Sequence, residues 1–120
     1  MAVKTLEANV RHQPGLTVID LQGDIDAAAE ATLNQAYNQA EQNNANPILL
    51  NFDKVEYINS TGIALIVGLL AKARQAHRRL MTCGLSDHYL EIFQITRLAD
   101  FMTIYDDEAG AIADTSAKPA

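Results

Sequence analysis

The sequence has few aromatic residues and almost no cysteine. It contains no Trp, four Tyr and three Phe, an aromatic share of 6%, so we expect a core built mainly from Leu, Ile, Val and Ala. Cys83 is the single cysteine, which excludes an intramolecular disulfide and a cysteine-rich zinc site. His and carboxylate residues are scattered without the spacing of a ligand set, and we predict no metal site and no cofactor.

Basic residues and long apolar runs are also scarce. Nine Lys and Arg against 15 Asp and Glu give a formal net charge of -6 and a pI near 4.8, which argues against nucleic-acid binding. The longest mostly apolar run, Ile63 to Ala71, is too short to span a bilayer. Because Met1 to Lys4 lacks the apolar core of a signal peptide, we expect a cytoplasmic protein without membrane insertion.

The composition that remains is that of an ordinary globular chain. Hydrophobic residues make up 48% of the sequence and charged residues 20%, and 120 residues suit one domain. We predict a single domain over residues 1–114 and a flexible tail over residues 115–120.

Apolar periodicity and turn residues predict strands that alternate with helices. We expect a hairpin turn at Pro14-Gly15, a helix cap at Asp26 and a second cap at Asp106. The expected strands are 4–10, 16–22 (closed by Gly23), 48–52, 79–83 and 102–105, and the expected helices are 27–43, 61–76, 86–96 and 108–113. A turn region is expected between the strand that ends at residue 52 and the helix that begins at residue 61. This order predicts a small α/β fold with a mixed, mainly parallel sheet of about five strands and about four helices.

The segment Asn59-Ser60-Thr61-Gly62 stands between an expected strand and a strongly apolar helix. Asn, Ser and Thr are favoured at helix starts because their side chains accept hydrogen bonds from unpaired amides, so a plain cap is the common explanation. A hydroxyl here is also where a phosphate is best tolerated, since the amides and the helix dipole favour negative charge. Phosphorylation would add about -1.5 to -2 charges at one surface point, and Ser60 is therefore a candidate phosphoryl acceptor.

The expected helix that follows has two unlike faces. At about 100° per residue, the side that should face the sheet carries Gly62, Ile63, Ile66, Leu69, Leu70 and Ala73. The opposite side, here called the small-residue stripe, carries Thr61, Ala64, Gly68, Ala71 and Gln75. A Gly inside a helix costs up to about 1 kcal/mol relative to Ala, so Gly68 indicates a close approach by another element. Docking of a partner and coverage by a helix of the same domain both remain open.

Five segments of the chain stand out by their order and spacing. These segments are Gly23-Asp24-Ile25-Asp26, Ile48-Leu49-Leu50-Asn51-Phe52, Val55-Glu56-Tyr57-Ile58-Asn59-Ser60-Thr61-Gly62, Cys83-Gly84-Leu85-Ser86 and Phe93-Gln94-Ile95-Thr96-Arg97-Leu98. Through them the chain resembles the STAS domain family (sulfate transporter and anti-sigma-factor antagonist) over nearly its whole length.

The resemblance implies a regulatory role and no enzymatic activity. Stand-alone members of the family are anti-sigma factor antagonists, which bind an anti-sigma factor that is also a serine kinase of the histidine-kinase-like ATPase type. The kinase phosphorylates the antagonist and releases it, and a serine phosphatase reverses the mark. By resemblance, this chain regulates transcription, or a related stress or metabolic response, through phosphorylation at Ser60.

The resemblance also implies a set of site residues. The family motif reads Asp-Ser-Ser/Thr-Gly, so Asn59 replaces the usual Asp and removes one negative charge beside the acceptor. An acidic pair in the family's first conserved loop matches Asp24 and Asp26. The expected partner-binding residues are Asp24, Asp26, Asn59, Ser60, Thr61, Gly62, Ala64 and Gly68.

Two alternative functions compete with this interpretation. Ser60 is a poor candidate for a hydrolase nucleophile because it does not lie in a Gly-x-Ser-x-Gly segment, and His12, His77 and His88 fall in separate segments. We expect His88 and Tyr89 on an exposed first helical turn. The second alternative stays open: a STAS scaffold or subunit of a stress-signalling or lipid/anion transport complex, without a switch. A monomer is the default expectation, with a dimer as the alternative.

Overall fold

The computed structural model describes residues 4–42 and 46–117. Within them the chain alternates strands and helices, as the sequence predicts. The elements are β1 (Glu7–Gln13), β2 (Leu16–Ile25), η1 (Ala27–Ala29), α1 (Glu30–Glu41), β3 (Ile48–Ile58), α2 (Ser60–Gln75), β4 (Leu80–Cys83), α3 (Asp87–Ile95), η2 (Leu98–Asp100), β5 (Thr103–Tyr105) and α4 (Glu108–Ala117).

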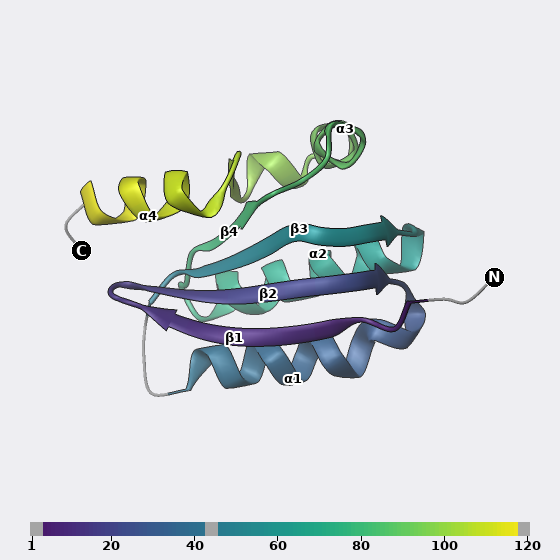
Figure 1. The fold of residues 1–120 in the computed structure, drawn as a ribbon, viewed down its shortest axis with the longest axis horizontal. Helices are drawn as coiled ribbons and strands as arrows, with labels where there is room; N and C mark the ends of the chain where they lie inside the picture. The colour runs from purple at the N-terminus through teal and green to yellow at the C-terminus, as the bar shows by residue number, and fades with distance from the viewer. Residues whose placement is uncertain (1–3, 43–45, 118–120) are drawn as a thin grey trace.

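The described strands form one five-stranded sheet in the order β1-β2-β3-β4-β5. Strand β1 pairs antiparallel with β2 across the expected turn at Pro14-Gly15, and every later pairing is parallel. Figure 1 shows β1 at the edge of the sheet. The predicted mixed, mainly parallel α/β fold is confirmed.

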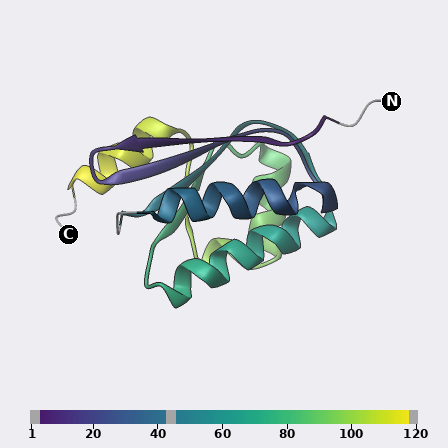
Figure 2. The ribbon, with the colours of Figure 1, turned by 90° about the horizontal axis from the view of Figure 1, so that it is seen from below.

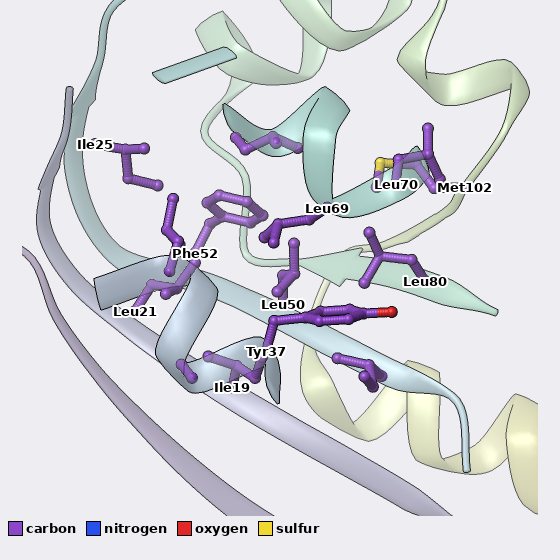
Figure 3. Close-up of a cluster of buried hydrophobic side chains, with 14 of the residues drawn as sticks. Ile19, Leu21, Ile25, Tyr37, Leu50, Phe52, Leu69, Leu70, Leu80 and Met102 are labelled. Carbon is purple, nitrogen blue, oxygen red and sulfur yellow. The ribbon is translucent and has the colours of Figure 1, made fainter. Parts of the chain in front are cut away.

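Helices cover both faces of the sheet. Helices α1 and α2 lie side by side against one face (Figure 2), and α4 packs on the other through Ala111, near the hairpin end of the molecule (Figure 1). The larger core lies under α1 and α2, where β2 and β3 supply apolar side chains from alternate positions. Figure 3 shows this core, with Ile19, Leu21, Ile25, Tyr37, Leu50, Phe52, Leu69, Leu70, Leu80 and Met102 labelled.

Aromatic side chains contribute more to the core than their low number suggests. Tyr37 and Phe93 are among the largest fully buried side chains. The rings of Phe52 and Phe93 meet edge to face, with centroids 5.9 Å apart. Most of the core is aliphatic, as expected, but these aromatic residues occupy its centre.

Three strands continue beyond their expected ends. Strand β1, expected over residues 4–10, runs from Glu7 to Gln13. Strand β2 does not stop at Gly23, which adopts a φ of +109° and leaves no room for a side chain, since a Cβ would lie 2.7 Å from the carbonyl oxygen of Thr5. The backbone N of Asp24 donates to the carbonyl oxygen of Lys4 at 2.9 Å. Because it has no side chain, Gly23 lets the backbone of residues 4 and 5 pass close to β2 inside the strand. The expectation that Gly23 ends the strand is wrong.

The region after Phe52 is also strand, where a turn was expected. Residues 53–57 are polar enough to suggest a turn, yet their backbone continues to pair with β2, up to Ile25 opposite Ile58. Their side chains are mostly exposed, which explains the polar composition. Because β3 extends to Ile58, the strand ends directly before Asn59.

The helix ends agree with expectation apart from α1 and α4. Asp26 caps the short η1 helix by accepting from the backbone N of Ala28 at 3.0 Å, and α1 begins only at Glu30. Asp107, and not Asp106, accepts from the backbone N of Gly110 at 2.8 Å at the start of α4. The expected end of α1 at residue 43 lies outside the described residues. Helix α4 runs to Ala117, so residues 115–117 of the expected tail are helical, and residues 118–120 lie outside the described part.

Candidate functional site

The candidate acceptor, Ser60, is the first residue of α2 and directly follows the capping residue. Asn59 has extended backbone angles (φ -91°, ψ -178°), and its Oδ1 accepts from the backbone N of Gly62 at 2.8 Å. The N-cap of α2 is therefore Asn59, and the hydroxyl of Ser60 is not needed to cap the helix. Ser60 is exposed, and within the described residues its hydroxyl has no hydrogen-bond partner.

Gly62 presses the start of α2 onto the end of β2. It is buried, and a Cβ at this position would lie 2.1 Å from the carbonyl oxygen of Ile25. The same carbonyl accepts from the backbone N of Asn59 at 3.2 Å. No larger residue fits at Gly62 without moving the helix, so the position of Ser60 is fixed by backbone contacts on both sides.

The acidic pair lies at the same end of the sheet. Asp24 pairs with Tyr57, and Ile25 with Ile58, at the end of β3 that leads to Asn59. The carboxylate of Asp24 accepts from the backbone N of Lys4 at 3.4 Å, whereas Asp26 is occupied in capping η1. The structure thus brings the acidic pair and the segment 59–62 to one edge, with Asp26 in a structural role.

The small-residue stripe of α2 lies on the surface. Its members, Thr61, Ala64, Gly68, Ala71 and Gln75, are all exposed. A Cβ added at Gly68 would meet nothing within 4 Å. Coverage by a helix of the same domain, left open above, does not occur among the described residues.

The sequence did not reveal two exposed apolar side chains, one on α2 and one near the end of β3. Val67 is 45% exposed and Tyr57 is 53% exposed. Val67 could have been found because it falls beside Ala64 and Ala71 of the stripe on a helical projection. Tyr57 could not, because the residues around it were expected in a turn rather than in a strand.

Tyr89 was expected on an exposed turn and is instead buried, with 9% of its surface exposed. Its hydroxyl accepts from the backbone N of Ile58 at 2.8 Å, so α3 holds the end of β3 just before the capping residue. His88 is exposed as expected. Tyr89 is therefore a positioning residue for the segment that carries Ser60.

Other site chemistries find little support in the described part of the chain. His12 lies on β1, His77 follows α2 and His88 is the second residue of α3, so the three histidines come from separate elements. No group of three His, Cys, Asp or Glu residues could hold a metal ion among residues 4–42 and 46–117. Across the same residues, no helix has the length and apolar character needed to cross a membrane.

The model of the STAS domain matches residues 7–111, and this chain belongs to the STAS domain family. An anti-sigma-B factor antagonist of Staphylococcus aureus is 32% identical over 82 residues, which cover 68% of this chain and 76% of the relative. The chain is thus similar to a regulatory antagonist over most of both sequences.

Solved structures show the same fold. An anti-sigma factor antagonist from Mycobacterium paratuberculosis superposes with a TM-score of 0.79 at 17% identity, covering 93% of this chain and 95% of that one. The Bacillus cell fate determinant SpoIIAA, solved in its phosphorylated form, gives a TM-score of 0.63 at 22% identity, covering 90% and 98%. At these identities the similarity establishes the fold alone.

Proposed function

We propose that this protein is an anti-sigma factor antagonist that binds an anti-sigma factor/serine kinase when unphosphorylated and is released by phosphorylation of Ser60. The observation that carries the proposal is the exposed Ser60 hydroxyl at the start of α2, relieved of capping by Asn59. Membership of the STAS family and the similarity to an anti-sigma-B factor antagonist support the general role. A serine phosphatase would restore the binding form.

The surface around Ser60 suits a closely approaching protein. Ala64 and Gly68 leave the outer face of α2 low and flat, and Val67 adds an exposed apolar contact. Thr61 and Asp24 supply polar groups at its end. Gly62 is buried, so a partner would not contact it directly. Gly62 contributes by fixing the backbone at the start of α2.

The chemistry of release follows from the position of the hydroxyl. A phosphate on Ser60 would sit at a helix N-terminus, where amides and the dipole stabilise negative charge, so the domain stays folded. The added charge of about -2 would stand at the edge of an apolar docking face and disrupt it. The fold is compatible with this modification, since SpoIIAA has been solved phosphorylated.

Asn59 distinguishes this site from the usual family motif. Its amide oxygen makes the cap contact, and Asn and Asp cap helices about equally well. The neutral side chain lowers the local negative charge, which eases the electrostatic cost of a phosphate. We propose that Asn59 adapts the site to its own kinase rather than disabling it.

The switch is tested by phosphorylation and by charge substitution. Incubation with ATP and the partner kinase should place phosphate on the peptide that contains Ser60. Ser60→Asp should weaken kinase binding about 10- to 100-fold, while the neutral control Ser60→Asn binds nearly as well as the wild type. If Ser60 stays unmodified and Ser60→Asp binds the kinase as well as the wild type does, the proposed phosphorylation switch is wrong. The alternative function, a STAS scaffold without a switch, is then favoured.

The docking face is tested at the glycine of the stripe. Gly68→Leu should impair partner binding while leaving the thermal midpoint nearly unchanged, because a Cβ there meets nothing within 4 Å. Ala31→Leu, at an exposed position on α1, is the matched control and should leave both properties unchanged. A large loss of stability in Gly68→Leu would show that the stripe is internal, and unimpaired binding would place the partner elsewhere.

A further inference from the structure

The described side chains of helix α4 make few buried apolar contacts with the sheet. Among its described side chains, 108–115, Ala111 is the one that is buried, and Ile112 is half-buried. The helix also contains Gly110, a poor helix former, and the acidic Asp114 in its second half, where the dipole favours cations. Its own sequence therefore gives it little stability apart from the sheet.

Polar contacts add to the attachment of α4. The guanidinium of Arg11 on β1 lies between two carboxylates: Nη2 is 3.0 Å from Oδ1 of Asp20 and 2.5 Å from Oε1 of Glu108. The side chains of Arg11 and Glu108 are 35% and 25% exposed. The hydroxyl of Tyr105 donates to the carboxylate of Asp114. Partly exposed pairs of this kind stabilise only modestly.

The surface beneath α4 is strongly apolar. It spans β2, β3 and β4, and each of its sheet side chains is no more than 1% exposed. Its members are Leu16, Val18, Leu49, Met81 and Cys83. These five side chains, here called the apolar strip, are therefore well buried beneath a weakly attached helix, α4.

We infer that α4 is a latch: it opens as a unit from an otherwise folded sheet, and the Arg11–Glu108 ion pair sets how often it opens. Segments with few buried contacts are the ones that open locally, at a free energy below that of global unfolding. Opening would expose the apolar strip, whose occupant in the closed state is the protein's own C-terminal helix. The strip lies on the face opposite α2, so the latch goes beyond the Ser60 switch and does not depend on it.

Cys83 reports the opening directly. It is the single cysteine, it is 1% exposed in the closed form, and it belongs to the cluster that includes Ala111 of α4. Burial raises the pKa of its thiol to about 12, which makes the closed form unreactive towards thiol reagents. The rate at which the full chain is labelled therefore measures how often the strip is uncovered.

The test measures labelling of Cys83 by dithionitrobenzoate across a urea series, together with amide hydrogen exchange. Labelling should depend weakly on urea, and the amides of α4 should exchange faster than those of β2, β3 and β4. Glu108→Gln should speed labelling roughly two- to fivefold. Gly110→Ala should slow it up to about fivefold, because a Cβ there makes only ordinary contacts, the nearest at 3.4 Å.

The control variant is Glu91→Gln on α3, which removes one carboxylate from an exposed position and should leave labelling unchanged. Labelling that depends on urea as strongly as global unfolding does, with α4 amides as protected as those of the sheet, would overturn the latch. An unchanged rate in Glu108→Gln would overturn the role given to the ion pair.

Discussion

On one face of the sheet, α1 and α2 bury a large continuous core that also involves α3, whereas on the other face α4 contributes one buried alanine, among its described side chains, over a short apolar strip. Because the two faces differ in buried apolar packing, we expect the helices on one face to stay in place and the helix on the other to open locally. The proposed acceptor, Ser60, belongs to a helix fixed by the main core, so we expect charge added there to alter the surface and leave the fold intact. On the opposite face, the proposed opening of α4 would leave Ser60 undisturbed.

The largest expected effect compares two neighbouring residues of β3 that point to opposite faces. Leu50 lies in the large core and Leu49 beneath α4, and both are 0% exposed. Leu50→Ala should reduce the free energy of unfolding by about 4 kcal/mol, and Leu49→Ala by about 2–3 kcal/mol, because a weakly held helix can settle into the cavity. Equilibrium urea unfolding measures both. Equal losses would mean that α4 is packed as firmly as α1 and α2.

Glycines at the two helices provide the next comparison. Gly62→Ala should cost about 3 kcal/mol, because the Cβ would lie 2.1 Å from the carbonyl oxygen of Ile25, a backbone atom that cannot turn away. Gly110→Ala should instead add about 0.5–1 kcal/mol to the stability of α4. Urea unfolding tests the first substitution, and amide exchange in α4 the second. A tolerated Gly62→Ala would contradict the close contact between α2 and β2.

Helix caps give a smaller contrast. Asn59→Ala removes the acceptor for the backbone N of Gly62 and should cost about 1 kcal/mol of global stability. Asn59→Asp keeps the cap and adds a negative charge at the helix N-terminus, worth about 0.3–1 kcal/mol. Asp107→Ala, at the start of α4, should speed Cys83 labelling while moving the global urea midpoint less than Asn59→Ala does. The reverse order would show that α4 unfolds with the rest of the domain.

Much of the fold could be predicted from the sequence because helix starts and turns carry local signals. Helix α3 begins within one residue of its expected start, where Ser86 caps it, and Pro14-Gly15 turns the hairpin as expected. The segment Asn59 to Gly62 was also placed at the start of a helix. These features depend on neighbours within a few residues, which a sequence displays directly.

The features that the sequence did not predict depend on distant residues. The second half of β3 is polar and becomes strand through pairing with β2. Tyr89 is buried because its hydroxyl reaches the backbone of Ile58. Arg11 meets Glu108 across nearly the whole chain. Each is a tertiary contact that overrides the local conformational preference of its residues. The periodicity of the sequence does not predict such contacts.

The smallest expected effect concerns the acid stability of the face beneath α4. Hydrogen bonding by Arg11 lowers the pKa of Asp20 below its ordinary value of 3.8, with a further contribution from Asn51. A carboxyl group whose pKa is lower in the folded state stabilises the protein above the unfolded value, and that stability is lost as the pH falls through the folded pKa. Below pH 3.8, stability should therefore fall less steeply in Asp20→Asn than in the wild type, while Glu91→Gln follows the wild-type slope. Urea midpoints measured from neutral pH down to pH 3 would show the difference, and parallel curves for Asp20→Asn and the wild type would mean that the Arg11–Asp20 contact contributes nothing to the folded state.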